Sequence, residues 1–287
     1  MIPPRKLITL PRSQKLRKAA KITEEAERQC IMFGRLEPEQ AEYLREVVEL
    51  LAKDEGFSVA QTAALENART ILGATGASGK DIHRAVDSVY HILLAETGRY
   101  QADWDFIEAP GSLDPSKRRP FSGMCVYLED IRSPFNVGSM FRSAESFGAE
   151  KLILSPLCAD PRHKRALRTA MGCVEILPWE RLPRDPFSDS PATPFSDSPC
   201  FTLETGGVPL ADFQFPSRGI LIAGSEELGV SPRALAVADA SLGRVSVPTY
   251  GAKGSLNVSV AFGIVMQAWA AALTKHLGIY YSDNING

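Results

Sequence analysis

The sequence of 287 residues predicts an α/β fold with a mainly parallel sheet, preceded by a small all-helical domain. Four short apolar runs alternate with helical patterns, as is typical of a parallel sheet covered on both faces; they lie at residues 124–128, 151–154, 219–223 and 244–247. Residues 1–108 show helical apolar spacing and no strand pattern. A stretch rich in Pro, Gly and Ser, residues 109–120, predicts a linker between this domain and a second one of residues 121–287.

Helix signals recur along the first domain. Pro38 occupies a first helical position, and apolar residues follow it at helical spacing. Ser58 opens another helix, and Ser78 with Asp81 three residues later resembles a capping box. We find no catalytic pattern in this domain.

The composition favours a globular, cytoplasmic protein without a metal site. The five cysteines are scattered and form no CxxC pair, which argues for free thiols in a reducing compartment. His83 and His91 lack the spacing of a metal-ligand pair. The N-terminus is basic and has no apolar segment, so we expect no signal peptide. The most apolar run, residues 258–273, contains Gln267 and is short for a membrane span, which predicts a buried or interface helix and no membrane partner.

The net charge of −2 gives no general support for binding a nucleic acid, but the charges are unevenly distributed. Residues 1–21 hold seven Lys and Arg and no acid, so they form either a phosphate-contacting arm or a solvated, partly disordered terminus. A second basic cluster, which we expect to contact nucleic-acid phosphates, consists of Arg162, Lys164, Arg165 and Arg168. The sequence PFSDSP occurs twice, at 186–191 and 194–199, and predicts a flexible insertion.

Three loops, each after a predicted strand, carry the candidate site residues. In the first, Asn136 and Gly138 shape the turn into a helix, and Arg142 lies off the apolar stripe of that helix. Arg142 is therefore free to reach a ligand or a partner chain, or it is an ordinary solvated arginine. In the second, Gly224 and Gly229 flank a loop at the carboxyl end of a strand, where ligands of open α/β sheets bind.

The third loop follows the strand at 244–247, which ends at Pro248. Ser255 stands at the expected N-cap of a helix from about residue 256 to residue 276, where free amides and the helix dipole suit a polar or anionic ligand group. The alternative is an ordinary connection between a strand and a helix. The sequence has neither a GxGxxG motif nor a P-loop, which argues against a dinucleotide or nucleoside triphosphate site.

In order and spacing, the three loops resemble the three motifs of the SpoU (TrmH) family of SPOUT RNA 2′-O-methyltransferases. The resemblance covers about residues 121–277 and rests on NVGSMFRSAESFG at 136–148, GSEELGVS at 224–231, and VPTYG and SLNVSVA at 247–251 and 255–261. It implies a trefoil-knotted α/β fold, S-adenosylmethionine as methyl donor, tRNA or rRNA as substrate, and a homodimer with active sites at the subunit interface. Because knots are very rare, only the resemblance predicts the knot.

The resemblance also implies roles for single residues. Arg142 would activate or position the ribose 2′-hydroxyl with the support of Asn136, and Ser255 and Asn257 would orient the substrate or the cofactor. The residues implied for the cofactor pocket are Leu221, Ile222, Ala223, Gly224, Glu226, Gly229, Val247, Pro248, Ser255, Leu256 and Asn257. Three positions depart from the family pattern: Ser225 stands where Asn or Gln is usual, Thr249 where Met is usual, and Ala170 where Ser is usual.

Transfer of a methyl group from a sulfonium to a hydroxyl requires an aligned oxygen and removal of its proton, but no metal. A guanidinium stays charged at ordinary pH, so Arg142 is an awkward general base. Either burial and a neighbouring cation allow it to accept a proton, or it clamps the adjacent phosphate and stabilises the developing alkoxide, which we favour. The alternative to an enzyme is a non-catalytic RNA-binding or ribosome-assembly factor that retains the fold. The presence of both Asn136 and Arg142 favours the enzyme.

Overall fold

The computed structural model describes residues 3–99, 113–187 and 198–277, and the chain divides into two compact units, residues 1–112 and 113–287. Each unit is described by itself. The predicted linker spans this division, and its residues 109–112 lie outside the described part of the chain, as does most of the repeated PFSDSP segment. The rest of the linker contains a 3₁₀ turn at Pro115–Lys117, where the Asp114 carboxylate accepts a hydrogen bond from the Ser116 amide.

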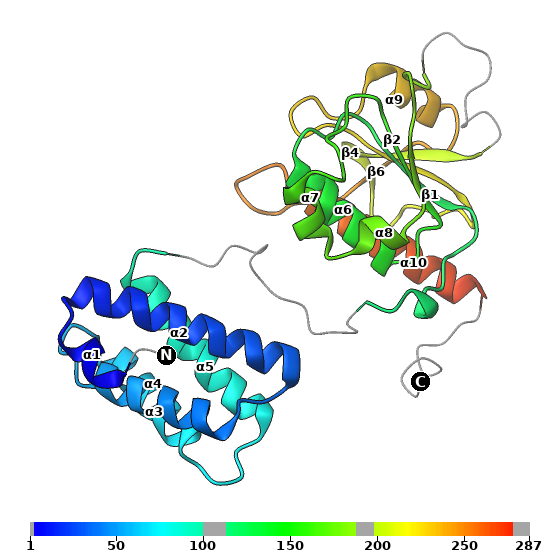
Figure 1. The fold of residues 1–287 in the computed structure, drawn as a ribbon. Helices are drawn as coiled ribbons and strands as arrows, with labels where there is room; N and C mark the ends of the chain where they lie inside the picture. Colours follow the sequence, from blue (N-terminus) through cyan, green and yellow to red (C-terminus); the bar gives the residue numbers. More distant parts are fainter. Residues whose placement is uncertain (1–2, 100–112, 188–197, 278–287) are drawn as a thin grey trace. The chain divides into compact units, whose positions relative to one another are not determined.

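The first unit is helical in its described residues (Figure 1). Its helices are α1 (Pro4–Ile8), α2 (Arg12–Phe33), α3 (Pro38–Ala52), α4 (Val59–Leu72) and α5 (Gly79–Glu96). Helix α2 packs against α5 and α3 packs against α4, which buries one apolar core. Ser58 and Gln61 form a capping box at the start of α4, and the Asp81 amide donates to Ser78 Oγ at the start of α5.

The basic N-terminal segment is not a disordered terminus in its described residues, because they form α1 and the beginning of α2. Its contact with phosphates stays a prediction. Arg12 makes ion pairs with Asp54 and Glu96, at 2.9 and 2.8 Å, and Lys15 also pairs with Asp54. Burial alone would raise the pKa of Asp54, but hydrogen bonds from Lys15 and Arg12 outweigh it and lower this pKa to about 2. Two of the seven cations therefore stabilise the helical unit itself.

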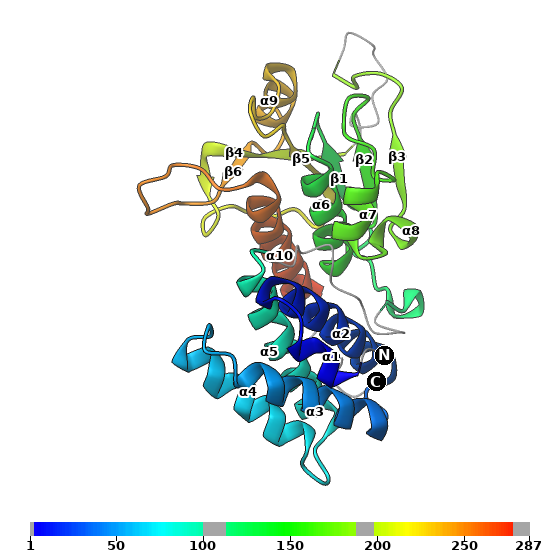
Figure 2. The same ribbon diagram turned by 60° about the vertical axis from the view of Figure 1, so that its left-hand side comes forward.

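The second unit contains a six-stranded sheet in the order β3-β2-β1-β5-β4-β6, and every strand pairing in it is parallel (Figures 1 and 2). The strands are β1 (Met124–Leu128), β2 (Lys151–Leu154), β3 (Trp179–Arg181), β4 (Cys200–Pro209), β5 (Gly219–Ala223) and β6 (Arg244–Ser246). The predicted parallel α/β fold is confirmed. Of the four predicted strands, three have the predicted bounds, and the last ends one residue early.

Strands β3 and β4 were not predicted from the sequence pattern. β3 has only three residues and lies at the edge of the sheet. β4 contains the adjacent residues Gly206 and Gly207, and its register against β6 shifts between Leu203 and Val208. Two glycines and a bulge interrupt the apolar pattern by which a strand is recognised.

Helices cover both faces of the sheet, as Figures 1 and 2 show. One face carries α6 (Pro134–Ser146), α7 (Lys164–Ala170), α8 (Cys173–Ile176) and α10 (Val258–Leu277), and the other carries α9 (Pro232–Asp239). Alternate residues of β1 follow this division: Val126 and Leu128 pack in the core under α6 and α10, and Tyr127 packs with α9. This alternation is the period of two expected for strands that are buried on both faces.

Helix α10 is only partly covered. Phe262, Met266 and Trp269 are fully buried against the sheet and α6, whereas Val260 and Ile264 are 52% and 37% exposed. By length and composition alone α10 could cross a membrane, and about a third of it is buried. Its N-cap is Asn257 rather than the predicted Ser255, because the Ser259 amide donates to Asn257 Oδ1 at 2.8 Å.

A buried acid makes the stability of the helical unit depend on pH. Glu27 on α2 is 7% exposed, and burial, followed by the nearby charges of Asp87 and Glu24, raises its pKa to about 7. A raised pKa in the folded state means that the stabilisation is complete below about pH 4.5 and is lost as the pH rises through about 7.

We therefore expect urea denaturation to show a fall in unfolding free energy of about 2 kcal/mol between pH 5 and pH 8 at this site. Glu27→Gln should remove that fall and be more stable than the wild type at pH 8. The control is Glu25→Gln, which changes an exposed acid of α2 that does not contribute to the raised pKa of Glu27. An equal pH dependence in the wild type and Glu27→Gln would contradict the assignment.

Candidate active site

Three loops meet at the carboxyl end of the sheet, after β1, β5 and β6, through a chain of hydrogen bonds. The carboxylate of Glu226, after β5, accepts the backbone amides of Arg132 and Ser133, both at 3.1 Å, and the side-chain amide of Asn136 at 2.7 Å. Burial would raise the pKa of Glu226, but the hydrogen bonds from Asn136 and the two amides outweigh it and hold this pKa below its ordinary value. Glu226 is therefore an ionised acceptor at the amino end of α6.

Asn136 also bonds to the third loop, through its side-chain oxygen. Its Oδ1 accepts from Asn257 Nδ2 at 3.2 Å, and Asn257 Oδ1 in turn accepts from the amide and the hydroxyl of Ser259. The amino ends of α6 and α10 are thus joined through Glu226, Asn136 and Asn257, three residues that the sequence analysis had assigned to this site.

A second carboxylate, which the sequence analysis missed, also connects the first two loops. Here the acid lies in the first loop and its donors lie in the second. Glu129, directly after β1, accepts the amide and the hydroxyl of Ser231, both at 2.7 Å, and Ser231 is the N-cap of α9. Burial raises the pKa of Glu129, with partial compensation by Ser231. An acid at the end of a buried strand, together with Ser before Pro232, is the sequence signal that could have indicated this pair.

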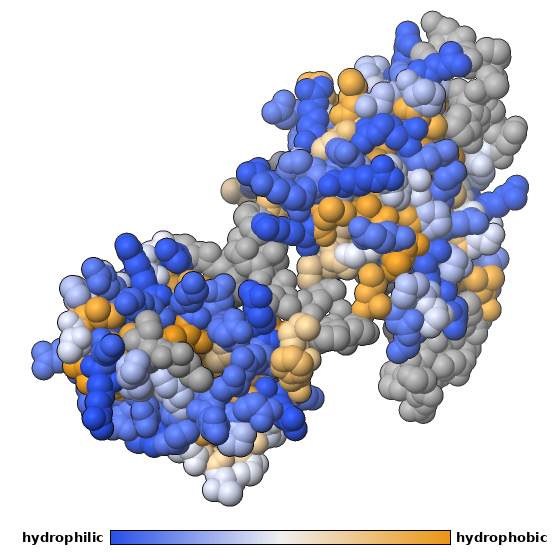
Figure 3. Space-filling model, in the orientation of Figure 1, coloured by the Kyte–Doolittle hydropathy of each residue, from blue (hydrophilic) through white to orange (hydrophobic). Residues whose placement is uncertain are grey.

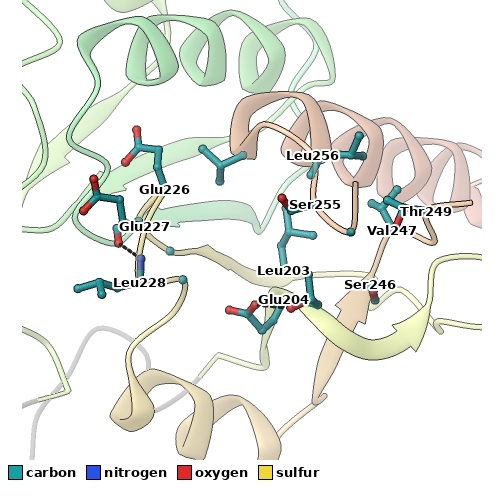
Figure 4. A pocket seen from close by; sticks show the side chains of 17 residues that line it. Leu203, Glu204, Glu226, Glu227, Leu228, Ser246, Val247, Thr249, Ser255 and Leu256 are labelled. Carbon is teal, nitrogen blue, oxygen red and sulfur yellow. Dashed lines mark hydrogen bonds between the residues drawn. The ribbon is translucent and has the colours of Figure 1, made fainter. Parts of the chain in front are cut away.

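Beside this network lies a cavity of about 400 Å³ (Figure 4). Six residues predicted for the cofactor pocket line it: Gly224, Glu226, Gly229, Val247, Ser255 and Leu256. The other predicted residues do not line it: Leu221, Ile222 and Ala223 are buried in β5, and Pro248 and Asn257 are neighbours in sequence of lining residues. The sequence analysis missed Leu203 and Glu204, which line the cavity from β4, a strand that it did not detect.

The loop after β5 is tightly folded. A Cβ on Gly224 would lie 2.2 Å from the backbone of Gly229, so only glycine fits there. Ser225 pairs with Gly229 through two backbone hydrogen bonds of 3.0 Å, and its hydroxyl accepts the Leu228 amide. The short side chain of Ser225, one of the departures from the family pattern, thus closes its own loop. Glu204 supports the same loop from β4 by accepting the Val230 amide at 3.1 Å.

The other two departures have different surroundings. Thr249 lines the cavity, and Figure 4 shows it beside Val247. Ala170 is fully buried at the end of α7 and does not line the cavity.

Arg142 lies apart from the cavity. It is exposed on α6 and is not a lining residue, and within the described residues its guanidinium has no hydrogen bond or ion pair. Three residues of the predicted basic cluster lie on α7, and Arg162 precedes this helix. Helix α7 lies against α6, since a Cβ on Gly138 of α6 would approach the Ala166 carbonyl oxygen of α7 to 2.3 Å. All four cluster residues are exposed, and the guanidinium of Arg162 lies over the ring of Trp179 at 5.2 Å; the cluster is Arg162, Lys164, Arg165 and Arg168.

Comparison with known proteins identifies a protein family whose model matches residues of the second unit. Residues 123–267 match the model of the SpoU rRNA Methylase family. A tRNA/rRNA methyltransferase of Synechocystis sp. is 29% identical over 158 residues, which cover 53% of this chain and 57% of that protein. The 23S rRNA (guanosine(2553)-2′-O)-methyltransferase RlmP of Bacillus subtilis is 27% identical over 152 residues, which cover 53% of this chain and 60% of that protein. The chain therefore spans less than two thirds of the length of these two curated relatives.

Among solved structures, the SpoU methyltransferase AviRb from Streptomyces viridochromogenes in complex with AdoMet is 25% identical in sequence. The match covers 60% of this chain and 67% of that one, with a TM-score of 0.46.

Removing the Glu226 carboxylate should loosen the whole site. We expect Glu226→Ala to lower the free energy of unfolding of the second unit by about 2–3 kcal/mol, because three donors lose a charged acceptor. Urea denaturation followed by tryptophan fluorescence measures the loss in a background in which Trp104 and Trp179 are replaced by Phe, so that the signal comes from Trp269, which is fully buried in this unit.

Glu226→Gln should cost less, since one acceptor oxygen remains. The matched control is Glu227→Ala, an exposed acid next in sequence, which should stay within about 0.5 kcal/mol of the wild type. Equal effects of the two alanine variants would contradict the bridging role of Glu226.

Proposed function

The chain belongs to the SpoU rRNA methylase family, and we propose that it is an S-adenosylmethionine-dependent RNA methyltransferase acting on a ribose 2′-hydroxyl of tRNA or rRNA. The main observation in support of the proposal is that side chains of the three loops bond to one another. Glu226, Asn136 and Asn257 come from distant parts of the chain and form one hydrogen-bond network beside a cavity. A protein that only bound RNA would have no chemical need for that cavity.

The cavity suits the proposed cofactor in size and chemistry. Its volume of about 400 Å³ falls within the range of small-molecule pockets, which is roughly 300–1,000 Å³. Leu203, Val247 and Leu256 offer apolar surface for a nucleobase, and the Glu204 carboxylate offers an acceptor for hydroxyl or ammonium groups. When bound, S-adenosylmethionine supplies an electrophilic methyl group on a sulfonium.

The protein's own contribution is to hold the 2′-hydroxyl and to accommodate its developing negative charge. We assign this to Arg142, whose guanidinium remains a cation and can hold the adjacent phosphate as well as the developing alkoxide. Asn136 fixes the position of α6, and hence of Arg142, relative to the cofactor cavity through its two hydrogen bonds. Ser255, which lines the cavity, supplies a hydroxyl for orienting the substrate or the cofactor.

We propose a homodimer, because one chain does not place Arg142 at its own cavity. A groove of about 510 Å³ runs along the contact between α6 and α10, and its lining includes Ser143, the exposed residues Val260 and Ile264, and Gly263. Figure 3 shows hydrophobic surface over the part of this unit where these helices lie. A second copy on this face would cover the apolar surface and bring an Arg142 toward the cavity of its partner.

The trefoil knot is also a proposal. Strand β6 lies at the edge of the sheet, whereas α10, which follows it, packs against α6 in the middle of the unit. The segment between β6 and α10 must therefore cross back over the carboxyl ends of β4 and β5, where it lines the cavity. This return path supports the knotted topology that the family resemblance implies.

RNA binding is assigned to two surfaces. The exposed cations of α7, Lys164, Arg165 and Arg168, lie beside the helix that carries Arg142 and suit the backbone phosphates. The helical unit is proposed as an additional RNA-binding part. The five cysteines are free thiols, in keeping with a cytoplasmic location.

The decisive experiment measures transfer of labelled methyl from S-adenosylmethionine to total tRNA and, separately, to rRNA, followed by nuclease digestion to identify the nucleoside. We expect a 2′-O-methylated product. Arg142→Ala should lower kcat by about 10²–10³-fold, the effect of removing one group that stabilises a developing oxyanion.

Cofactor binding to Arg142→Ala, measured by calorimetry, should match the wild type, because Arg142 does not line the cavity of its own chain and its proposed contacts are to the ribose hydroxyl and the phosphate of the RNA. Arg142→Lys retains the positive charge and should recover part of the rate. Cofactor binding without transfer to either RNA pool would instead support a non-catalytic RNA-binding factor.

The dimer makes a separate prediction. Val260→Asp combined with Ile264→Asp should shift the chain from dimer to monomer in analytical ultracentrifugation and abolish methyl transfer, because charges cannot be buried in an apolar interface without a partner. Val237→Asp, an exposed apolar residue of α9 on the other side of the sheet, is the control and should leave the oligomeric state unchanged. A wild type that sediments as a monomer would refute the dimer.

A further inference from the structure

The short edge strand β3 places two side chains against the loop between β2 and α7, residues 155–163. Trp179 and Arg181 are two positions apart in this strand, so both lie on the face of the sheet that carries α6 and α7. The chemistry proposed above gives neither residue a role.

Arg181 holds the first part of this loop by its backbone. Its Nη1 donates to the carbonyl oxygens of Ser155, Pro156 and Cys158, at 3.0, 3.1 and 2.8 Å. Its Nη2 donates to the carbonyl oxygen of Ala159 at 3.2 Å. A guanidinium suits this arrangement because it is a rigid planar group with several donors, whereas a lysine has one nitrogen.

Trp179 holds the last part of the loop. The guanidinium of Arg162 lies over its ring at 5.2 Å. The ring is itself fixed, since its Nε1 donates to the Val174 carbonyl at 3.2 Å and its edge packs against Phe141 of α6. A cation over an aromatic face is attracted by the ring, so Arg162 has a preferred position before any ligand binds.

The loop and α7 together carry an excess of positive charge that the protein does not neutralise. Residues 155–170 contain four Lys and Arg and one acid, Asp160, whose carboxylate accepts the Arg162 amide at 2.9 Å. Neither these four cations nor Arg181 forms an ion pair with any described residue. The four carbonyl oxygens bonded to Arg181 also point at a cation, so they do not repel an anion at this surface. The surface therefore suits phosphate groups.

We propose that β3 holds residues 155–165 as a preformed binding surface for RNA phosphates, with Arg181 as the positioning residue. Arg181 acts through the loop, which it fixes ahead of Arg162 and the start of α7, and does not itself contact the RNA. Order in the free protein reduces the entropic cost that binding would otherwise include. This inference rests on the proposed function for the identity of the ligand as RNA.

A different role for Arg181 would be to support the active-site loops. The same loop bonds to the loop after β1, because the Asp130 amide donates to Ser155 Oγ at 2.9 Å and the Ala159 amide donates to the Ile131 carbonyl at 2.8 Å. These contacts do not involve Arg181, and no residue of 155–163 lines the cofactor cavity. We therefore expect loss of Arg181 to change RNA binding and not cofactor binding.

The test uses the full chain with Arg181→Met, which keeps an unbranched apolar stem and removes the donors. Phosphate contacts carry no sequence information, so labelled total tRNA and, separately, labelled rRNA are suitable probes in filter binding. The variant should bind both about fivefold or more weakly than the wild type. Its dependence of log K on log salt should be shallower by about 0.7–0.9 for each phosphate that is no longer neutralised.

Arg181→Lys keeps the charge on a single nitrogen and should recover only part of the affinity. The matched control is Arg184→Met, which removes an exposed arginine three positions further on that has no hydrogen bond to a described residue. This control should change the affinity less than about twofold. Urea denaturation gives the folded fraction of each variant, and affinities are expressed per folded molecule; if Arg181→Met does not fold, the incomplete recovery in Arg181→Lys tests the proposal.

A double-mutant cycle separates positioning from direct contact. Because Arg181 acts through the loop that leads to Arg162, Arg181→Met should weaken RNA binding less in an Arg162→Gln background than in the wild type. In methyl transfer, Arg181→Met should raise KM for RNA and leave kcat within about twofold of the wild type.

Four outcomes overturn the proposal: unchanged affinity and salt dependence in Arg181→Met, full recovery in Arg181→Lys, effects of Arg162→Gln and Arg181→Met that simply multiply, or a lower kcat with unchanged KM. Calorimetry with S-adenosylmethionine and methyl transfer are measured on the same wild-type preparation. If the wild type binds the cofactor and transfers methyl while the Arg181 predictions fail, this inference falls alone. If the wild type does neither, the proposed function falls.

Discussion

The carboxylate of Glu226 holds the amino end of α6 through two backbone amides and, by way of Asn136 and Asn257, the amino end of α10. Helix amino ends have unpaired amides and a positive dipole, so the ionised carboxylate of Glu226 stabilises α6, and the side chain of Asn257 accepts an amide at the start of α10. Because β1, β5 and β6 all end at the same edge of a parallel sheet, one side chain can connect the loops that follow them. The cavity takes its shape from this connection.

A second carboxylate secures the same loops from the opposite direction. Glu129 of the first loop holds the amino end of α9, just as Glu226 of the second loop holds that of α6. Because each loop supplies a carboxylate that binds the other, the two loops are fixed relative to each other although neither is a helix or a strand. Gly224 and Gly229 add a backbone contact that no side chain could permit. These contacts hold the first two loops in place without a ligand, and a preorganised site reduces the entropic cost of binding and of aligning the reactants.

The position of Arg142 has a different consequence. Its helix is fixed by the network and by the close contact of Gly138 with α7, yet its guanidinium faces solvent beside an uncovered apolar groove. Cofactor cavity and proposed catalytic cation are thus both well positioned within one chain but apart from each other. The proposed dimer explains both facts. Its interface would bring Arg142 to the cavity of the other copy and would cover the exposed residues of α10. The helical unit has its own apolar core and its own ion pairs.

The sequence by itself determined the parallel α/β class, four of the six strands and the order of the three motif loops, because apolar runs, helix caps and glycines are local signals. It also identified Asn136, Glu226 and Asn257, although only through their resemblance to a family. Tertiary structure alone decided that these three side chains bond to one another, that Glu129 meets Ser231 across 102 positions of the chain, and that β4 brings Glu204 to the cavity. It also decided that Arg12 and Lys15 are used for ion pairs inside the helical unit. The sequence shows the type of each residue and the local pattern around it. Which side chains bond to one another depends on the tertiary fold, because the partners lie far apart in the chain and no pattern of neighbouring residues contains that information.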